Sequence, residues 1–177
     1  MGVSEFLFKG GAKCVSLYGL EGKGKTSIAL QAAKEHRLTY YISTEGQIEG
    51  RISRMGLGER LIFAFAPDRA SFLTALAGLS KIDRPFDLVI VDTANSIYRQ
   101  TWSLKDLYLP LALLKDLSVR GPRVLTVWEM STNNRVAGEK IMRAYCERVL
   151  RATGGYILGN NESCKYKVAP EGVLACL

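Results

Sequence analysis

The chain has 177 residues, enough to bury one sizeable core but few for two, so we expect a single domain over residues 1–177. With 47% hydrophobic and 23% charged residues it has the composition of an ordinary globular protein, which excludes a disordered or fibrous chain. A formal charge of +7 suits a polyanionic partner such as nucleic acid, although many basic proteins bind none.

The apolar runs are too short to span a bilayer. One of the longest, residues 107–114, falls well short of the roughly 18 residues that a spanning helix needs. Residues 1–13 contain Glu5 and lack the apolar region and cleavage site of an export signal. We therefore expect a soluble, cytoplasmic protein with no membrane partner.

Short apolar runs alternate with helical segments in the first three quarters of the chain. The expected strands are residues 14–18, 38–43, 61–65, 88–92 and 124–128. Helices are expected at residues 26–36, 69–82 and 105–119. Apolar residues there have helical spacing, and Pro110 is expected to kink or delay the last helix. The alternation is typical of a mainly parallel sheet with crossover helices.

The pattern changes after Gly138. One short helix is followed by three apolar runs, separated by Gly-Gly, Asn-Asn and Pro-Glu-Gly turns, at residues 147–152, 155–159 and 165–168. We expect antiparallel strands that close one side of the sheet. The predicted fold is therefore α/β, with a mainly parallel central sheet flanked by helices and antiparallel strands at the C-terminal end.

The cysteines show no metal-binding spacing. The chain has a single histidine and no CxxC pair among Cys14, Cys146, Cys164 and Cys176. A zinc site is therefore not expected, and we predict reduced cysteines packed in the core. One exception stays open, because a hairpin centred near Pro170 would bring Cys164 and Cys176 opposite each other. Such a bridge would suggest a hyperthermophilic source.

The strongest motif is a phosphate-binding loop. Residues 19–26, Gly-Leu-Glu-Gly-Lys-Gly-Lys-Thr, match the pattern G-x-x-x-x-G-K-[ST] between an expected strand and an expected helix. Backbone N–H groups of such a loop face phosphate, and the helix adds the positive end of its dipole. Lys25 would reach the β- and γ-phosphates of ATP, and Thr26 would bind Mg²⁺. The predicted nucleotide-binding residues are Glu21, Gly22, Lys23, Gly24, Lys25, Thr26 and Ser27.

Two carboxylates are expected near this loop. The strand at 88–92 ends in Asp92, a candidate Walker B acid that would help to hold Mg²⁺, or else a cap for the next turn. The strand at 38–43 leads into Glu45, at the sheet edge where ligands of open α/β folds bind. Glu45 would polarise the attacking water, or would be a solvated loop charge.

Three further segments are similar to those of a known family. YISTEG at 41–46, LVIVDTANSIYR at 88–99 and KYKVAPEGV at 165–173 resemble YIDTEG, LVVVDSITALYR and the terminal FRITDEG-like hairpin of the RecA/RadA recombinase family. The resemblance extends along nearly the whole chain and implies a RecA-like P-loop ATPase core. It makes Glu45 the match to the family's catalytic glutamate, which acts together with Lys25.

The chain departs from the family pattern in several places. Members usually end the fifth core strand in Asn-Gln, whose glutamine senses the γ-phosphate, whereas this chain has Trp128 and Glu129. The FxxA match at residues 72–75 lies within an expected helix and is interpreted as core rather than as a polymerisation motif. We expect no helix–hairpin–helix domain before the core. These departures resemble an archaeal RadA paralogue, RadB-like or RadC-like, reduced to the ATPase core.

The resemblance also implies a site for single-stranded DNA. In the family two loops contact DNA, and the matching positions are residues 97–103 and 131–140. Arg99, Arg135 and Lys140 would contact phosphates, and Trp102 would offer a stacking face. Ordinary polar surface loops are the alternative. A solvated helix face is expected for Arg51, Arg54 and Arg60.

The leading hypothesis is an ATP- and Mg²⁺-dependent accessory protein of homologous recombination and DNA repair, which binds single-stranded DNA and assists the main recombinase. Slow hydrolysis is expected because the usual glutamine is missing. One alternative is a KaiC-like regulatory ATPase, whose pattern usually has paired glutamates where this chain has Glu45 and Gly46. Another is a nucleotide-gated protein-interaction module without DNA binding.

Overall fold

The computed structural model describes residues 1–82 and 84–176. Its parallel strands are β1 (Cys14–Leu20), β2 (Thr39–Ser43), β3 (Leu61–Phe65), β4 (Leu88–Asp92), β5 (Arg123–Met130) and β6 (Arg148–Ala152). Three strands add to β6 in antiparallel pairs: β7 (Tyr156–Gly159), β8 (Glu162–Ala169) and β9 (Gly172–Ala175). Within the described residues they form one nine-stranded sheet in the order β3-β2-β4-β5-β1-β6-β7-β8-β9.

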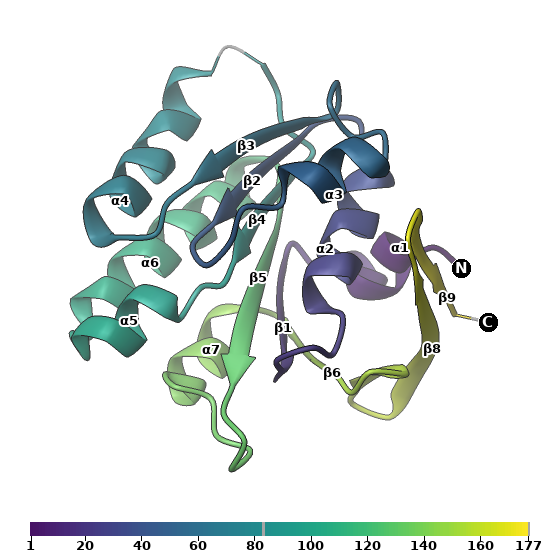
Figure 1. The fold of residues 1–177 in the computed structure, drawn as a ribbon. Helices are drawn as coiled ribbons and strands as arrows, with labels where there is room; N and C mark the ends of the chain where they lie inside the picture. Colours follow the sequence, from purple (N-terminus) through teal and green to yellow (C-terminus); the bar gives the residue numbers. More distant parts are fainter. Residues whose placement is uncertain (83, 177) are drawn as a thin grey trace.

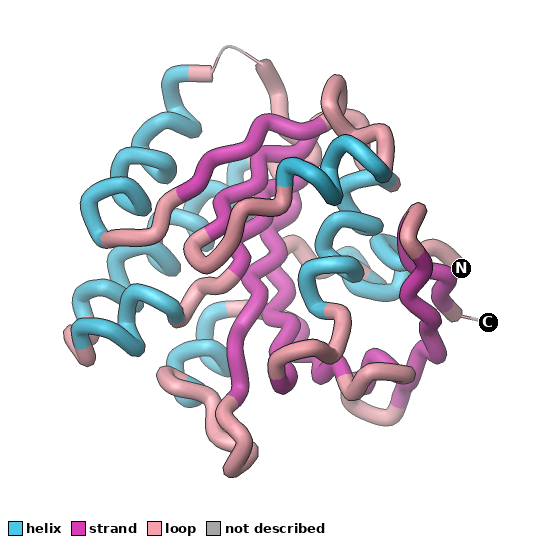
Figure 2. The backbone as a smooth tube through the Cα atoms, viewed as in Figure 1, coloured by secondary structure: helices cyan, strands magenta, loops and turns pink. Residues whose placement is uncertain are grey.

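Helices cover both faces of this sheet (Figures 1 and 2). One face carries α1 (Val3–Leu7), α2 (Lys25–Lys34) and α3 (Glu49–Arg54). The other carries α4 (Arg69–Gly78), α5 (Ser96–Thr101), α6 (Lys105–Arg120) and α7 (Glu139–Tyr145). The described residues also form two 3₁₀ turns, η1 (Lys9–Gly11) and η2 (Leu79–Lys81).

Strand β4 contributes side chains to the hydrophobic cores on both faces of the sheet. Leu88 and Ile90 belong to the cluster under α1 and α2, whereas Val89 and Val91 belong to the cluster under α4 and α6. Successive side chains of a strand point to opposite faces, so a strand that is covered on both sides must be apolar throughout. All four side chains are fully buried. Each contributes roughly 1.5–3 kcal/mol to folding.

The long predicted helices are present. α4 begins after Asp68, whose side chain accepts a hydrogen bond from Ser71 N at 2.8 Å and so caps the helix. It ends at Gly78 and passes into η2, which ends at Lys81, one residue before the predicted boundary. α6 begins at Lys105 as predicted, is not delayed, and continues through Pro110.

The prediction for residues 147–152 is wrong in strand direction. β6 pairs with β1 in parallel, with Val15 opposite Arg148, rather than antiparallel to its neighbour. The reason is α7, which connects β5 to β6 as a crossover and returns the chain in the same direction. The antiparallel part of the sheet therefore begins only at β7.

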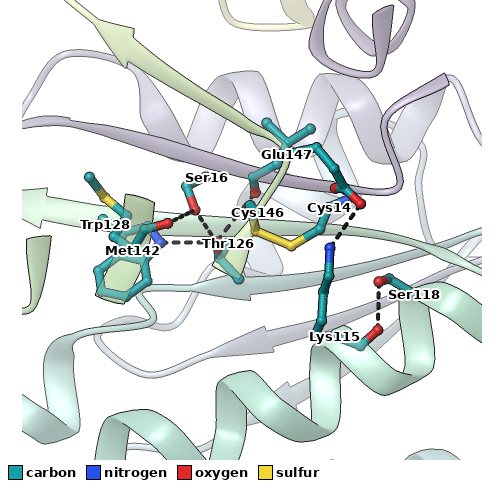
Figure 3. Close-up of a disulfide and its surroundings, with 10 residues drawn as sticks. Cys14, Ser16, Lys115, Ser118, Thr126, Trp128, Met142, Cys146 and Glu147 are labelled. Atoms are coloured by element: carbon teal, nitrogen blue, oxygen red, sulfur yellow. Dashed lines mark hydrogen bonds and ion pairs between the residues drawn. A yellow bond between two sulfur atoms is a disulfide. The ribbon is translucent and has the colours of Figure 1, made fainter. Parts of the chain in front are cut away.

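The cysteines form two disulfides. Cys14 at the start of β1 is bonded to Cys146 just before β6, so the prediction of reduced thiols is wrong at this pair (Figure 3). The parallel β1–β6 pairing brings these two residues together. The second bond joins Cys164 to Cys176 across the C-terminal hairpin, which is the exception that the sequence left open.

In the described ranges, no helix combines the length and apolar character that crossing a membrane requires.

Candidate nucleotide-binding site

The carboxyl ends of β1, β2, β4 and β5 meet at one edge of the sheet, because these strands are parallel. A cavity of about 880 Å³ lies at this edge. All seven residues predicted to bind the nucleotide line it, from Glu21 to Ser27. The same cavity is lined by Glu45, Asp92 and Glu129. The fold therefore brings together the segments that the sequence singled out separately.

The loop at residues 19–26 depends on glycine. Gly22 and Gly24 have φ angles of 74° and 78°, the left-handed region that favours glycine. A Cβ atom on Gly24 would also lie 3.1 Å from Val168 and 3.3 Å from Tyr166 of β8. Gly24 directly precedes α2, so the positive end of that helix dipole faces the cavity from Lys25 onward.

The C-terminal hairpin supports this loop from outside. The hydroxyl of Tyr166 donates a hydrogen bond to the carbonyl of Lys23 and accepts one from Gly154 N at 3.0 Å. Lys167 and Val168, the next residues of β8, line the cavity. The hairpin thus forms one wall of the site, a role that the sequence did not predict.

A cluster of oxygen atoms lies at the end of β4. The hydroxyl of Thr26 donates to Asp92 Oδ2 at 2.7 Å, and the hydroxyl of Tyr41 donates to the same oxygen at 2.6 Å. Burial and the neighbouring Asp92 raise the pKa of Tyr41 well above its usual value, so Tyr41 remains a hydrogen-bond donor at neutral pH. Hard oxygen ligands are those that Mg²⁺ prefers. Thr26 and Asp92 therefore fit the metal that the motif implies.

Thr93 adds a further polar group to the lining of the cavity. Its buried hydroxyl oxygen has no hydrogen-bond partner among residues 1–82 and 84–176. Buried polar groups in proteins are rarely left without a partner. The orphaned hydroxyl is consistent with a binding site in which a ligand or ordered water completes the hydrogen bonding.

The lysine of the loop is held by two groups. Lys25 is only 5% exposed, donates to the carbonyl of Leu20 at 2.7 Å and forms an ion pair with Glu129 Oε2 at 3.0 Å. Burial raises the pKa of Glu129 above its usual value, and Lys25 opposes this effect. The sequence identified Glu129 as the replacement for a glutamine but not as the partner of Lys25.

Glu45 lies at the end of β2, as predicted. The preceding Thr44 accepts a hydrogen bond from Thr93 N at 2.9 Å and donates one to Thr93 O at 2.8 Å, which joins the ends of β2 and β4. The side chain of Glu45 lies 3.6 Å from Arg99 of α5, and both are about 43% exposed. Glu45 therefore has a charged partner, Arg99, and is also partly exposed to solvent.

The fold of the chain is similar to those of solved structures. No protein-family model and no curated protein sequence matches the chain. Among solved structures, the RadB recombinase superposes with a TM-score of 0.71 and 19% identity, over 96% of this chain and 94% of that chain. A KaiC-like protein from the hyperthermophilic archaeon Pyrococcus horikoshii superposes with a TM-score of 0.69 and 15% identity, over 97% and 94%. The chain has the RecA-like fold.

The predicted fold class is thus confirmed, since the RecA-like fold has the mainly parallel sheet and the C-terminal antiparallel strands that the sequence indicated. At these identities the likeness establishes the fold alone. The FxxA match is part of the core of this fold, because Phe72 and Ala75 are buried in α4.

The candidate DNA-binding segments follow β4 and β5. The prediction of a loop at 97–103 is wrong, because α5 forms there with Ile97 buried against the core. Trp102, directly after α5, is 67% exposed and packs edge-on against Tyr98. Arg135 and Lys140, which follow β5, are exposed. Contact with DNA stays a prediction for all of them.

Several residues of the site were missed by sequence reasoning. Tyr41 could have been found, because the alternation in β2 places its side chain on the same face as Leu61 and Ile90, under α2 and beside the loop. Asn95 gave no such signal, although its side chain hydrogen-bonds both the N–H and the carbonyl of Glu129 at 3.0 Å. Arg51 is an exposed residue of α3, as predicted, and it also lines the cavity, which was not predicted.

Proposed function

We propose that this chain binds ATP with Mg²⁺ at residues 19–26, hydrolyses it slowly, and acts as an accessory protein of homologous recombination and DNA repair. The observation that carries the proposal is the 2.7 Å hydrogen bond from Thr26 to Asp92, within a cavity that also contains Lys25 and Glu45. A glycine-rich turn without a ligand would not need a buried acid and a lysine at the same sheet edge.

Each of these residues has a separate task in the proposal. Lys25 binds the β- and γ-phosphates, while Thr26 and Asp92 hold the metal. Bound Mg²⁺ would neutralise charge on the phosphate oxygens. Glu45 accepts a proton from the attacking water at its carboxylate.

Slow turnover is proposed because two of the reacting groups already have charged partners. Lys25 is paired with Glu129 at 3.0 Å, and Glu45 is paired with Arg99 at 3.6 Å. A group that holds an ion pair must give it up, or share it, before it engages the phosphates or the water. Steady-state hydrolysis by the wild type and by Glu45→Gln tests this assignment, because the variant should lose turnover while it retains ATP binding.

Single-stranded DNA is proposed as a partner, at the surface next to the cavity. Arg135 and Lys140 are exposed after β5, at the same sheet edge as the nucleotide site, and the chain has a net charge of +7. The exposed ring of Trp102 would stack with a base. The likeness to the RadB recombinase supports the role in recombination.

A protein partner, the main recombinase, is also proposed, in the cytoplasm. The side chains of Leu104, Leu109 and Leu113 are about half exposed at the start and along the outer face of α6. Exposed apolar surface of this kind is typical of protein interaction sites.

The DNA contact is tested by fluorescence anisotropy with a labelled single-stranded oligonucleotide across a salt series. Arg135→Ala with Lys140→Ala should weaken binding and lower the slope of log affinity against log salt by about 1.4, since each phosphate contact contributes about 0.7. Arg37→Ala is the matched control, because Arg37 is also exposed but precedes β2 at the opposite sheet edge. No binding by the wild type at low salt would reject the DNA role.

A KaiC-like regulatory ATPase is the second candidate, supported by a TM-score of 0.69 that is close to the value for the RadB recombinase. This candidate predicts ATP hydrolysis without any DNA binding. The same pair of assays therefore separates the two functions.

A further inference from the structure

The ion pair between Lys25 and Glu129 lies inside the cavity that would receive the phosphates. Lys25 is 5% exposed and the side chain of Glu129 is 15% exposed, so water screens this pair far less than a surface pair. Both residues line the cavity together with Asp92. The main cationic group for the terminal phosphates is therefore already bound to an anion of the protein itself.

The backbone fixes Glu129 in this position. Glu129 is paired with Gly19 in the β1–β5 register, directly beside the start of the phosphate-binding loop. Asn95, which is fully buried, accepts a hydrogen bond from Glu129 N and donates one to Glu129 O, each at 3.0 Å. The backbone of Glu129 is therefore held beside the loop, with its carboxylate against Lys25.

A carboxylate at this position must affect which nucleotide binds. A lysine of a phosphate-binding loop contacts the β- and γ-phosphates. ADP lacks the γ-phosphate, so Lys25 can bind the β-phosphate and keep part of its contact with Glu129. The γ-phosphate of ATP would add negative charge close to the carboxylate of Glu129. Two neighbouring negative charges repel each other more strongly where water is excluded than in bulk water.

We propose that Glu129 competes with the γ-phosphate of ATP for Lys25 and thereby shifts the preference of the site from ATP towards ADP. The inference rests on the proposed nucleotide-binding function and deepens it, because it assigns the residue that sets the specificity for the terminal phosphate. In this role Glu129 shortens the lifetime of the ATP-bound form. It does the opposite of a glutamine, whose neutral amide would donate a hydrogen bond to the phosphate.

The test measures equilibrium dissociation constants for ATP and for ADP, each with Mg²⁺, on the wild type and on Glu129→Gln by isothermal titration calorimetry. The variant keeps the size of the side chain and removes its charge. We expect ATP binding to tighten about tenfold, the equivalent of one charge-assisted hydrogen bond, and ADP binding to change by less than about threefold. The ratio of the two constants is the decisive quantity, because a general loss of structure would not change it in this direction.

Glu162→Gln is the matched control. The carboxylate of Glu162 is 19% exposed and also forms ion pairs, with Lys9 and Arg148, but it lies outside the cavity. The ratio of the dissociation constants for ATP and ADP in this control should equal that of the wild type. Both variants replace a glutamate by glutamine. A ratio that changes only in Glu129→Gln is therefore due to the position of Glu129 in the cavity, and not to the loss of a carboxylate charge as such.

Two results would overturn the inference while leaving the nucleotide site intact. An unchanged ratio in Glu129→Gln would show that the carboxylate does not discriminate between the nucleotides. Weaker ATP binding in the variant would show that Glu129 assists the γ-phosphate instead of opposing it. If neither the wild type nor the variant binds any nucleotide, the proposed function itself fails, and the inference fails with it.

Discussion

Removing the disulfide between Cys14 and Cys146 should destabilise the protein more than removing the one between Cys164 and Cys176. The first bond closes a chain segment with a sequence separation of 132, whereas the second has a separation of only 12. A cross-link stabilises mainly by reducing the entropy of the unfolded chain, and the effect increases with the length of the closed loop. The entropy model gives about 5 kcal/mol for the long loop and about 3 kcal/mol for the short one.

The two closed segments do not overlap along the chain, so their contributions should add. The assay is equilibrium urea unfolding of the oxidised wild type and of two double variants, Cys14→Ala with Cys146→Ala and Cys164→Ala with Cys176→Ala. Addition of a reducing agent to the wild type should reproduce the sum of the two losses. Equal losses in the two variants, or a larger loss at the C-terminal hairpin, would show that the length of the closed loop does not determine the stabilisation.

Two further predictions concern single side chains. Tyr41→Phe removes one of the two donors to Asp92 and should lower the free energy of unfolding by about 1.5–3 kcal/mol, measured in urea; a variant as stable as the wild type would contradict this. Glu162→Gln should cost about 1 kcal/mol at pH 7. The hydrogen bond from Lys9 and the Arg148 guanidinium lower the pKa of Glu162, so its contribution is present above about pH 4.3 and is lost as the pH falls through the lowered folded pKa. If the difference in the free energy of unfolding between the wild type and Glu162→Gln persists in acid, the stabilising role of the Glu162 carboxylate is contradicted.

Much of the fold could be predicted because its signals are local. The run from Leu88 to Val91 is apolar at every position, which is typical of a parallel strand covered on both faces, and residues 19–26 have a pattern that requires a strand before it and a helix after it. The direction of β6 was not accessible in the same way. It depends on the crossover through α7 and on the pairing with β1, which no short stretch of sequence specifies.

The candidate site was predictable in part for the same reason. Lys25 and Thr26 are fixed by the motif, and Asp92 and Glu45 by their places at strand ends. The contacts among these residues join segments far apart in the sequence, such as Lys25 with Glu129. The sequence can place Lys25 and Glu129 at the same sheet edge. Whether the carboxylate of Glu129 forms an ion pair with Lys25 depends on side-chain geometry, which the sequence does not give.

Nucleotide binding at residues 19–26 can be measured by isothermal titration of ATP in the presence and absence of Mg²⁺, on the wild type and on Lys25→Ala. Thermal unfolding without nucleotide checks that the variant is folded. We expect saturable, Mg²⁺-dependent binding by the wild type, and a loss of affinity of at least about tenfold in the variant, because the cationic group for the terminal phosphates is gone. Binding that is equal in the two proteins, or that is unaffected by Mg²⁺, would contradict the assignment of residues 19–26 and Asp92 as the nucleotide site.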